Sequence, residues 1–415
     1  MAYGRFCLSP YHLVSSNGYS DCFHLQQDLQ AWGSMMNREK LCDLALIIGR
    51  QDKDLLSLDI YTHHYLLPFT PRLRTIDFVV SSLVHAQVNP LLVLTPEDSD
   101  ILHNYLVKGW PESEVYVFDK QKTEMEFFPF IETLKTDHSL KTIGIFYGHF
   151  PNWFLPPDRH KFPSYALLQY ETPEERVPVG AILPFRAFED GIRATSQQHL
   201  YDFLENILVN LSQEKRMHRV NLKGYFRSHY TIEEYYQIHM DMIDDYYFLD
   251  HLNSLVPVRS FTTPNVISRT YRSSHVINSI VGENVHIYGR VENSVICSNV
   301  IVDKKAIVKN SLILPGNHIG SEACIEYAIL DEFSLENTLP NIASKCRIGT
   351  SSPVRSNEKF PQLKNGLTLI GKDVMLPEKS IIGGNCYIES FIPQGVLKRH
   401  HVLRDGESLL YYEEK

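Results

Sequence analysis

Two arginines close together in the sequence, Arg72 and Arg74, are candidates for contact with a phosphorylated ligand because of their side-chain chemistry. A guanidinium group presents planar donors that pair with phosphate bidentately. Gly49 and Arg50 form a second candidate pair, because a glycine lets backbone amides approach phosphate closely and Arg50 could supply charge. The competing interpretation of Arg74 is structural, since Asp77 could pair with it at the start of a helix.

The elements that would position these residues follow from the hydrophobic pattern of residues 41–260, which predicts an α/β domain with a mostly parallel sheet. Short apolar runs, each followed by Gly, Pro, Asp or Glu, predict buried strands at 44–48, 91–94, 115–118 and 143–147. Apolar residues at helical spacing predict crossover helices at 98–108 and 127–134. Such sheets bind ligands at the carboxyl ends of their strands, where Gly49 and Arg50 fall.

From His275 onward the sequence repeats. Four similar blocks begin at Val276, Val291, Val308 and Ile325. A unit this short cannot bury its own apolar face, but stacked coils of three short strands can, so residues 261–415 are predicted to form a left-handed hexapeptide-repeat β-helix. The asparagines at equivalent coil positions are expected to form a side-chain ladder: Asn278, Asn293 and Asn310.

Three other segments frame these domains. A polar stretch with three prolines predicts a loop inserted near 337–366, and Phe261–Pro264 is expected to be the linker. Residues 1–40 show no periodicity and remain an unassigned N-terminal extension.

Composition limits the classes of partner and the cellular location that can be expected. The 415 residues carry 40 basic and 49 acidic side chains, a formal charge of −9, which argues against nucleic acid. No apolar run is long enough to span a membrane and no secretory signal is visible, so a cytoplasmic protein is expected. The seven cysteines are never at Cys-x-x-Cys spacing and are read as reduced thiols.

Three segments together resemble the ADP-glucose pyrophosphorylases (glucose-1-phosphate adenylyltransferases), and more closely the non-catalytic partner subunit found in some bacteria. Pro68–Val84 is similar to the family's Pro-Phe-Gly-Gly-Arg/Lys-Tyr-Arg-Ile-Ile-Asp-Phe motif, and Lys223–Met242 is similar to its Gly-Tyr-Trp-x-Asp-x-Gly-Thr-Ile motif. The third segment is the β-helix. The resemblance implies a nucleotidyltransferase-like Rossmann-type domain that binds ATP and glucose 1-phosphate, and oligomers that respond to effectors. It also places Arg72 and Arg74 on the ligand-bearing face.

The residues that would carry the family's reaction are replaced. The resemblance implies two Mg²⁺-binding aspartates, but His149 and Ser228 stand at those positions. Imidazole and hydroxyl are poor ligands for this hard cation, so both are degenerate metal positions. Tyr230 replaces a glycine of the second motif, and only Arg176 lies near the place of the sugar-phosphate lysine. No catalytic residue and no cofactor are therefore expected, with Mg²⁺ required only if the protein is active.

These losses predict a catalytically impaired regulatory or structural subunit of glycogen biosynthesis. One alternative is an active nucleotidyltransferase that forms ADP-glucose with altered ligands such as Glu233. A second alternative is a hexapeptide-repeat acyltransferase using one of its β-helix histidines: His275, His286 or His318.

The expected partners follow from the exposed end coils of the β-helix, which another chain can cap. A homo-oligomer or a hetero-oligomer with a catalytic pyrophosphorylase subunit is expected. A sugar-phosphate or nucleotide effector is a further candidate partner. Lys398–His401 with Arg404 could form an anion site, and the alternative interpretation of this run is a solvated charged edge.

Overall fold

The computed structural model describes residues 40–49, 54–60, 62–96, 99–137, 139–172, 175–245, 257–261, 267–272, 274–335, 339–350, 352 and 355–411. They divide into two compact units that do not follow sequence order. The first comprises the described residues of Met1–Gln51, Thr75–Arg227 and Tyr247–Phe261. The second comprises those of Asp52–Arg74, Ser228–Tyr246 and Thr262–Lys415. Two segments expected in the α/β domain therefore belong with the β-helix.

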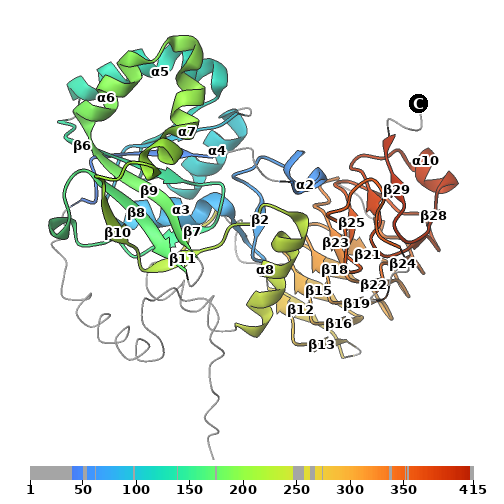
Figure 1. Ribbon diagram of the computed structural model, residues 1–415. Helices are drawn as coiled ribbons and strands as arrows, with labels where there is room; N and C mark the ends of the chain where they lie inside the picture. The colour runs from blue at the N-terminus through green and yellow to red at the C-terminus, as the bar shows by residue number, and fades with distance from the viewer. Residues whose placement is uncertain are drawn as a thin grey trace, which may run out of the picture. The chain divides into compact units, whose positions relative to one another are not determined.

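The first unit is built on a seven-stranded sheet in the order β10-β8-β9-β6-β1-β4-β5 (Figure 1). Strand β9 runs antiparallel to both of its neighbours, and the other pairs in the sheet are parallel. A two-stranded ribbon, β7 with β11, completes the unit's strands. The strands are β1 (Leu44–Ile48), β4 (Leu91–Leu94), β5 (Val115–Phe118), β6 (Thr142–Tyr147), β7 (Asn152–Phe154), β8 (Ala166–Glu171), β9 (Arg176–Pro184), β10 (His218–Asn221) and β11 (Gly224–Phe226).

Helices cover this sheet because its central strands are apolar on both faces. All five residues of β1 are buried. Helices α5, α6 and α7 gather on one side of the sheet (Figure 1), where their apolar residues share a core cluster with β1 and β6. The helices are α3 (Thr75–His85), α4 (Ser99–Gly109), α5 (Lys120–Asp137), α6 (Phe185–Ala194) and α7 (Leu200–Ser212), with short 3₁₀ turns at Arg159–Lys161 and Gln197–His199.

This architecture confirms the predicted α/β class and all four predicted strands. The helix expected at 98–108 is α4, and the one expected at 127–134 is part of the longer α5. The antiparallel strand β9 does not stand out in the sequence pattern, because a strand next to a parallel sheet carries no signal of its direction.

The second unit contains the predicted β-helix, whose short parallel strands stack into three sheets. The first sheet has the order β12 (Arg269–Thr270), β15 (His286–Ile287), β18 (Ile301–Val302), β21 (His318–Ile319). The second has the order β13 (His275–Ile277), β16 (Arg290–Glu292), β19 (Ile307–Lys309), β22 (Cys324–Glu326), β24 (Arg347–Ile348), β26 (Ile381–Ile382), β28 (Val402–Leu403). The third has the order β14 (Ile280–Val281), β17 (Val295–Ile296), β20 (Leu312–Ile313), β23 (Ala328–Leu330), β25 (Thr368–Ile370), β27 (Tyr387–Ile388), β29 (Ser408–Leu409).

The register of these coils matches the repeat in the sequence. Val276, Val291, Val308 and Ile325, which open the four blocks, are paired in succession through β13, β16, β19 and β22. The asparagines two residues after the first three have φ of 44°, 44° and 46°, and Asn278 Nδ2 donates to Asn293 Oδ1 at 3.0 Å. Asparagine tolerates this left-handed conformation, so it suits a tight corner.

Helix α8 (Ile232–Asp244) covers the outward face of the third sheet. The helix begins with a capping box, in which Thr231 and Glu234 satisfy each other's backbone amides. Its buried side chains share one cluster with α2 (Ser57–Ile60) and with the outward row of the sheet, which contains Val295, Leu312, Ile329, Leu369 and Tyr387. Burying each large apolar side chain contributes about 1.5–3 kcal/mol, so this cover is a major part of the unit's stability.

The hairpin of β2 (Pro68–Phe69) and β3 (Leu73–Arg74) and the helix α10 (Gln394–Arg399) complete the second unit. The expected loop near 337–366 contains β24, and Ile342, Cys346 and Ile348 lie in the β-helix core, so the coil continues through much of that segment. Of the expected linker, only Phe261 lies among the described residues, and of the N-terminal extension only Lys40. No helix in the described part of the chain is long and apolar enough to cross a membrane.

Candidate functional site

The carboxyl ends of the parallel strands in the first unit are the place where this fold class binds ligands. Strand β1 ends at Ile48 and is followed by the buried Gly49, while β6 ends at Tyr147. The Gly148 amide donates to the Ile48 carbonyl at 2.9 Å, so the two strand ends lie side by side. Arg50 lies outside the described residues.

His149, which stands where the resemblance implies the first metal-binding aspartate, is only 1% exposed. Its ring lies 5.2 Å from that of Tyr147 and 4.1 Å from that of Phe150. An imidazole among aromatic rings lacks the anionic oxygens that Mg²⁺ prefers.

Two further rings extend this group into an aromatic cluster of Tyr147, His149, Phe150, Tyr170 and Phe226. The Phe226 ring lies 5.9 Å from that of Phe150 and is stacked 5.7 Å from that of Tyr170. Tyr170 is fully buried, its hydroxyl donates to the Trp153 carbonyl at 2.6 Å, and burial raises its pKa well above the ordinary value. These rings occupy the ends of β6, β8 and β11 with apolar surface, which excludes water and does not solvate phosphate.

Asn152, on β7, is a polar residue of this region that the sequence motifs do not single out. It is fully buried and its Nδ2 donates to the Tyr147 carbonyl at 3.1 Å and to the Val179 carbonyl at 3.4 Å. Its Oδ1 has no hydrogen-bond partner within the described segments. A single asparagine between two short runs gives no periodic signal by which the sequence could have identified it.

Ser228, which stands where the resemblance implies the second metal-binding aspartate, belongs to the second unit, whereas His149 belongs to the first. Over the residues that the structure describes, no three His, Cys, Asp or Glu side chains are grouped so as to hold a metal ion. The imidazole of His149 and the hydroxyl of Ser228 lack the anionic oxygens that Mg²⁺ prefers. Tyr230, two residues after Ser228, is 42% exposed, and its amide donates to Glu234 Oε2 at 2.7 Å.

Arg72 and Arg74 lie on the β2–β3 hairpin of the second unit, and both pair with carboxylates of the β-helix. Arg74 Nη1 lies 2.7 Å from Glu332 Oε1 and also donates to the Leu66 carbonyl at 2.9 Å. Arg72 Nη1 lies 3.4 Å from Glu283 Oε1 in a more exposed setting. These ion pairs give both arginines a structural role.

Asp77, the other residue considered for Arg74, accepts hydrogen bonds from the Tyr105 hydroxyl at 2.8 Å and 3.0 Å. It therefore links α3 to α4 within the first unit.

The remaining charged candidates are also engaged in local contacts. Arg176 pairs with Glu171 across the β8–β9 turn at 2.9 Å, which favours a charged surface turn over a sugar-phosphate site. Glu233 lies 2.9 Å from the Lys364 ammonium.

Comparison with known proteins agrees with the fold. Residues 263–370 match a family model described as GlmU-like, C-terminal hexapeptide. The chain is 28% identical over 202 residues to a glucose-1-phosphate adenylyltransferase of Acetivibrio thermocellus, and 31% identical over 191 residues to one of Fervidobacterium nodosum. These two matches cover 48% and 45% of this chain and 45% and 44% of the relatives, so the similarity spans less than half the length of either relative.

A longer match exists with the glucose-1-phosphate adenylyltransferase of Corynebacterium jeikeium. It is 28% identical over 392 residues and covers 75% of this chain and 92% of that protein. The chain is thus related to the glucose-1-phosphate adenylyltransferases and carries a GlmU-like hexapeptide domain.

Proposed function

We propose that this protein is a catalytically impaired relative of glucose-1-phosphate adenylyltransferase that acts as a regulatory or structural subunit in cytoplasmic glycogen synthesis. The observation that supports the proposal is the aromatic cluster at the strand ends, which includes His149 at a position where the resemblance implies a carboxylate. Transfer of an adenylyl group needs preorganised cations and amide donors around phosphate, and the rings present neither.

The test is a pyrophosphate-release assay with ATP, glucose 1-phosphate and Mg²⁺. The purified chain alone should give no turnover above the no-protein control. Mixed with a catalytic adenylyltransferase subunit from the same cells, it should change that subunit's effector response or thermal stability. Turnover by the chain alone at an ordinary enzymatic rate of about 1 s⁻¹ or more would refute the proposal.

The competing function is an active nucleotidyltransferase with altered ligands, and the 92% coverage of the Corynebacterium jeikeium relative favours it. That function requires ATP to bind. Calorimetric titration of ATP with Mg²⁺ into the full chain distinguishes the impaired subunit from the active nucleotidyltransferase. Binding with a millimolar or lower dissociation constant would support the active nucleotidyltransferase, and absence of binding would exclude it.

A hexapeptide acyltransferase is the remaining alternative, favoured by the GlmU-like match. His318 Nε2 lies 3.3 Å from Asp303 Oδ2, a pair that could orient an imidazole. Binding of acetyl-CoA that is lost in His318→Asn would support this function, and absence of binding would exclude it.

We further propose that the chain assembles through the first coil of the β-helix, as a homo-oligomer or with a catalytic subunit. Val276 and Ile277 on β13 are 37% and 49% exposed at the start of the second sheet. An end coil of this kind is covered either by another segment of the same chain or by another chain, and the exposure of Val276 and Ile277 supports the second. A monomeric mass, both in cell extract and after purification, would contradict this assembly.

An effector that contacts Arg72 or Arg74 would have to compete with Glu283 and Glu332 for these side chains.

A further inference from the structure

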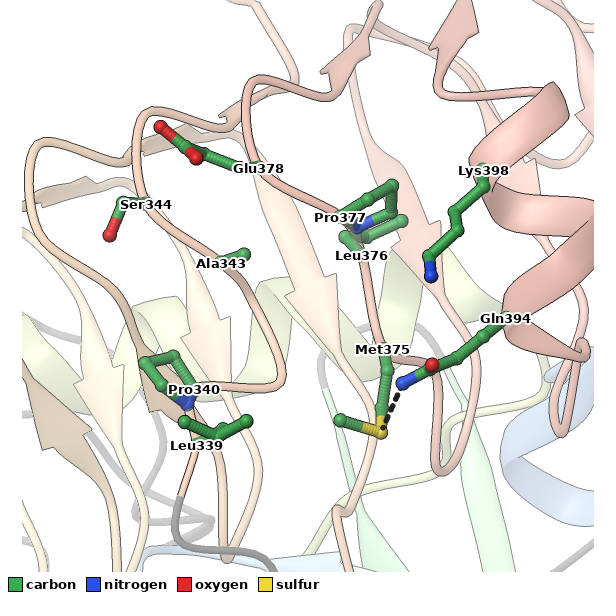
Figure 2. A pocket seen from close by; sticks show the side chains of 10 residues that line it. All are labelled: Leu339, Pro340, Ala343, Ser344, Met375, Leu376, Pro377, Glu378, Gln394 and Lys398. Carbon is green, nitrogen blue, oxygen red and sulfur yellow. Dashed lines mark hydrogen bonds between the residues drawn. The ribbon is translucent and has the colours of Figure 1, made fainter.

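A pocket of about 280 Å³ lies on the β-helix beside α10, within the second unit (Figure 2). Its floor is formed by two successive coil segments that are joined through a bridge between Ile342 and Leu376. The side chains of the floor are apolar: Leu339, Pro340, Ala343, Leu376 and Pro377. The small side chain of Ala343 leaves the floor hollow, so the pocket can hold a compact apolar group.

One wall of this pocket is a polar face of α10. Gln394 and Lys398 are four residues apart and therefore project from the same side of the helix, as Figure 2 shows. Gln394 Nε2 lies 3.2 Å from the Met375 sulfur, a contact that fixes the carboxamide. The buried Val396 and Leu397 hold the helix against the β-helix, so this wall is positioned by packing.

The charge of the wall is uncompensated. No Asp or Glu oxygen in the described chain lies within 4 Å of the Lys398 ammonium. The nearest acidic residue of the lining, Glu378, lies across Pro377 from Lys398 (Figure 2). A single cation in the lining above an apolar floor suits one negative charge. The carboxylate of Glu378, which lies 3.9 Å from the Lys379 ammonium outside the lining, disfavours a ligand with two negative charges.

We propose that this pocket binds a small monocarboxylate with a compact apolar body. The carboxylate pairs with Lys398, and the apolar body fills the hollow over Ala343 and Leu376. Donors for a phosphate dianion or for the hydroxyls of a sugar are too few in this lining, so a sugar phosphate is a poorer fit. The proposal is independent of whether the first unit is catalytic.

The test is titration of phenylacetate and of its neutral isostere phenylacetamide into the full chain, followed by calorimetry. We expect phenylacetate to bind with a millimolar or lower dissociation constant and phenylacetamide to bind at least about tenfold more weakly, because it lacks the charge. Lys398→Met should weaken phenylacetate binding by about tenfold. The matched control is Arg399→Met, which removes the neighbouring cation of α10 from outside the lining and should leave binding unchanged.

A second variant tests the floor. Ala343→Met fills the hollow and should abolish phenylacetate binding, with a far-ultraviolet spectrum like that of the parent as evidence of folding. The proposal is overturned if phenylacetate does not bind at millimolar concentration, if the amide binds equally well, or if Lys398→Met and Arg399→Met have the same effect.

Discussion

His239 on α8 is fully buried, and its environment makes the protonated ring unfavourable. Burial lowers its pKa from 6.5 to about 4, and the hydrogen bond between Nδ1 and the Tyr235 carbonyl only partly opposes this effect. In the unfolded chain the ring binds a proton below about pH 6.5, whereas in the folded chain it stays neutral down to about pH 4. Folding stability should therefore fall as the pH drops through this window, by about 3 kcal/mol in total.

The measurement is urea unfolding of the parent chain and of His239→Phe at several pH values. The variant should lose this part of the acid sensitivity, whatever its stability at neutral pH. His275→Gln, which changes an exposed histidine of β13, should keep the acid sensitivity of the parent. Parallel pH profiles for the parent and for His239→Phe would show that His239 is not the group responsible.

The ion-pair partners of Arg72 and Arg74 could not be predicted from the sequence. The motif around Pro68 identifies Arg72 and Arg74 as unusual, but their carboxylate partners are 211 and 258 residues further along the chain. No local spacing rule connects residues so far apart. That His149 and Ser228 stand where the resemblance implies aspartates can, by contrast, be seen directly in the sequence, because it depends only on which residue stands at a position.

The β2–β3 hairpin is held to the β-helix by two ion pairs of unequal burial. The side chains of Arg74 and Glu332 are 25% and 14% exposed, whereas those of Arg72 and Glu283 are 42% and 29% exposed. Arg74→Met should destabilise the protein by about 1–3 kcal/mol, because Glu332 would be left partly buried and, among the described residues, would keep an ion pair only with Lys372 at 3.6 Å. Arg72→Met should cost less than about 1 kcal/mol.

Chemical denaturation of the two variants checks this difference, since both substitutions keep an aliphatic side chain of similar length. The double variant Arg74→Met with Glu332→Gln should recover part of the loss, because it removes the unpaired carboxylate. Equal effects of Arg72→Met and Arg74→Met would contradict the assignment of Arg74 as the main anchor.

Secondary-structure elements differ in how clearly the sequence pattern predicts them. Strand β1 is buried along its whole length and bounded by turn residues, so its five apolar residues predict it well. The β-helix is predictable because Val291 and Val308 repeat at the coil period. Strands β8, β9 and β10 are not, because their pairing and direction depend on neighbours that the local pattern does not specify.

The β-helix depends on cover from outside its own contiguous sequence. Expressed alone, residues 263–415 would lack α8 and would expose the outward row of the third sheet, including Leu312 and Ile329. We expect this fragment to aggregate, because a contiguous apolar face on a sheet promotes association. Size-exclusion chromatography is the measurement, with the full chain as the control.

A matched variant of the fragment tests whether the face that α8 covers causes the aggregation. Replacing Leu312 and Ile329 with threonine keeps the preference for strands but removes apolar surface from the face that α8 covers. The substituted fragment should elute closer to its monomeric volume. Aggregation that is unchanged by these substitutions would mean that another surface, such as the first coil, is responsible.

The chain passes between its two units five times, at 51/52, 74/75, 227/228, 246/247 and 261/262. The helix that shields the β-helix is therefore encoded between parts of the α/β unit. A lineage that no longer needed adenylyl transfer could lose catalytic side chains one by one, but deletion of the whole α/β unit would also break the path that delivers α8. The path of the chain thus gives a physical reason for the large α/β unit and the β-helix to be kept together, with or without catalysis.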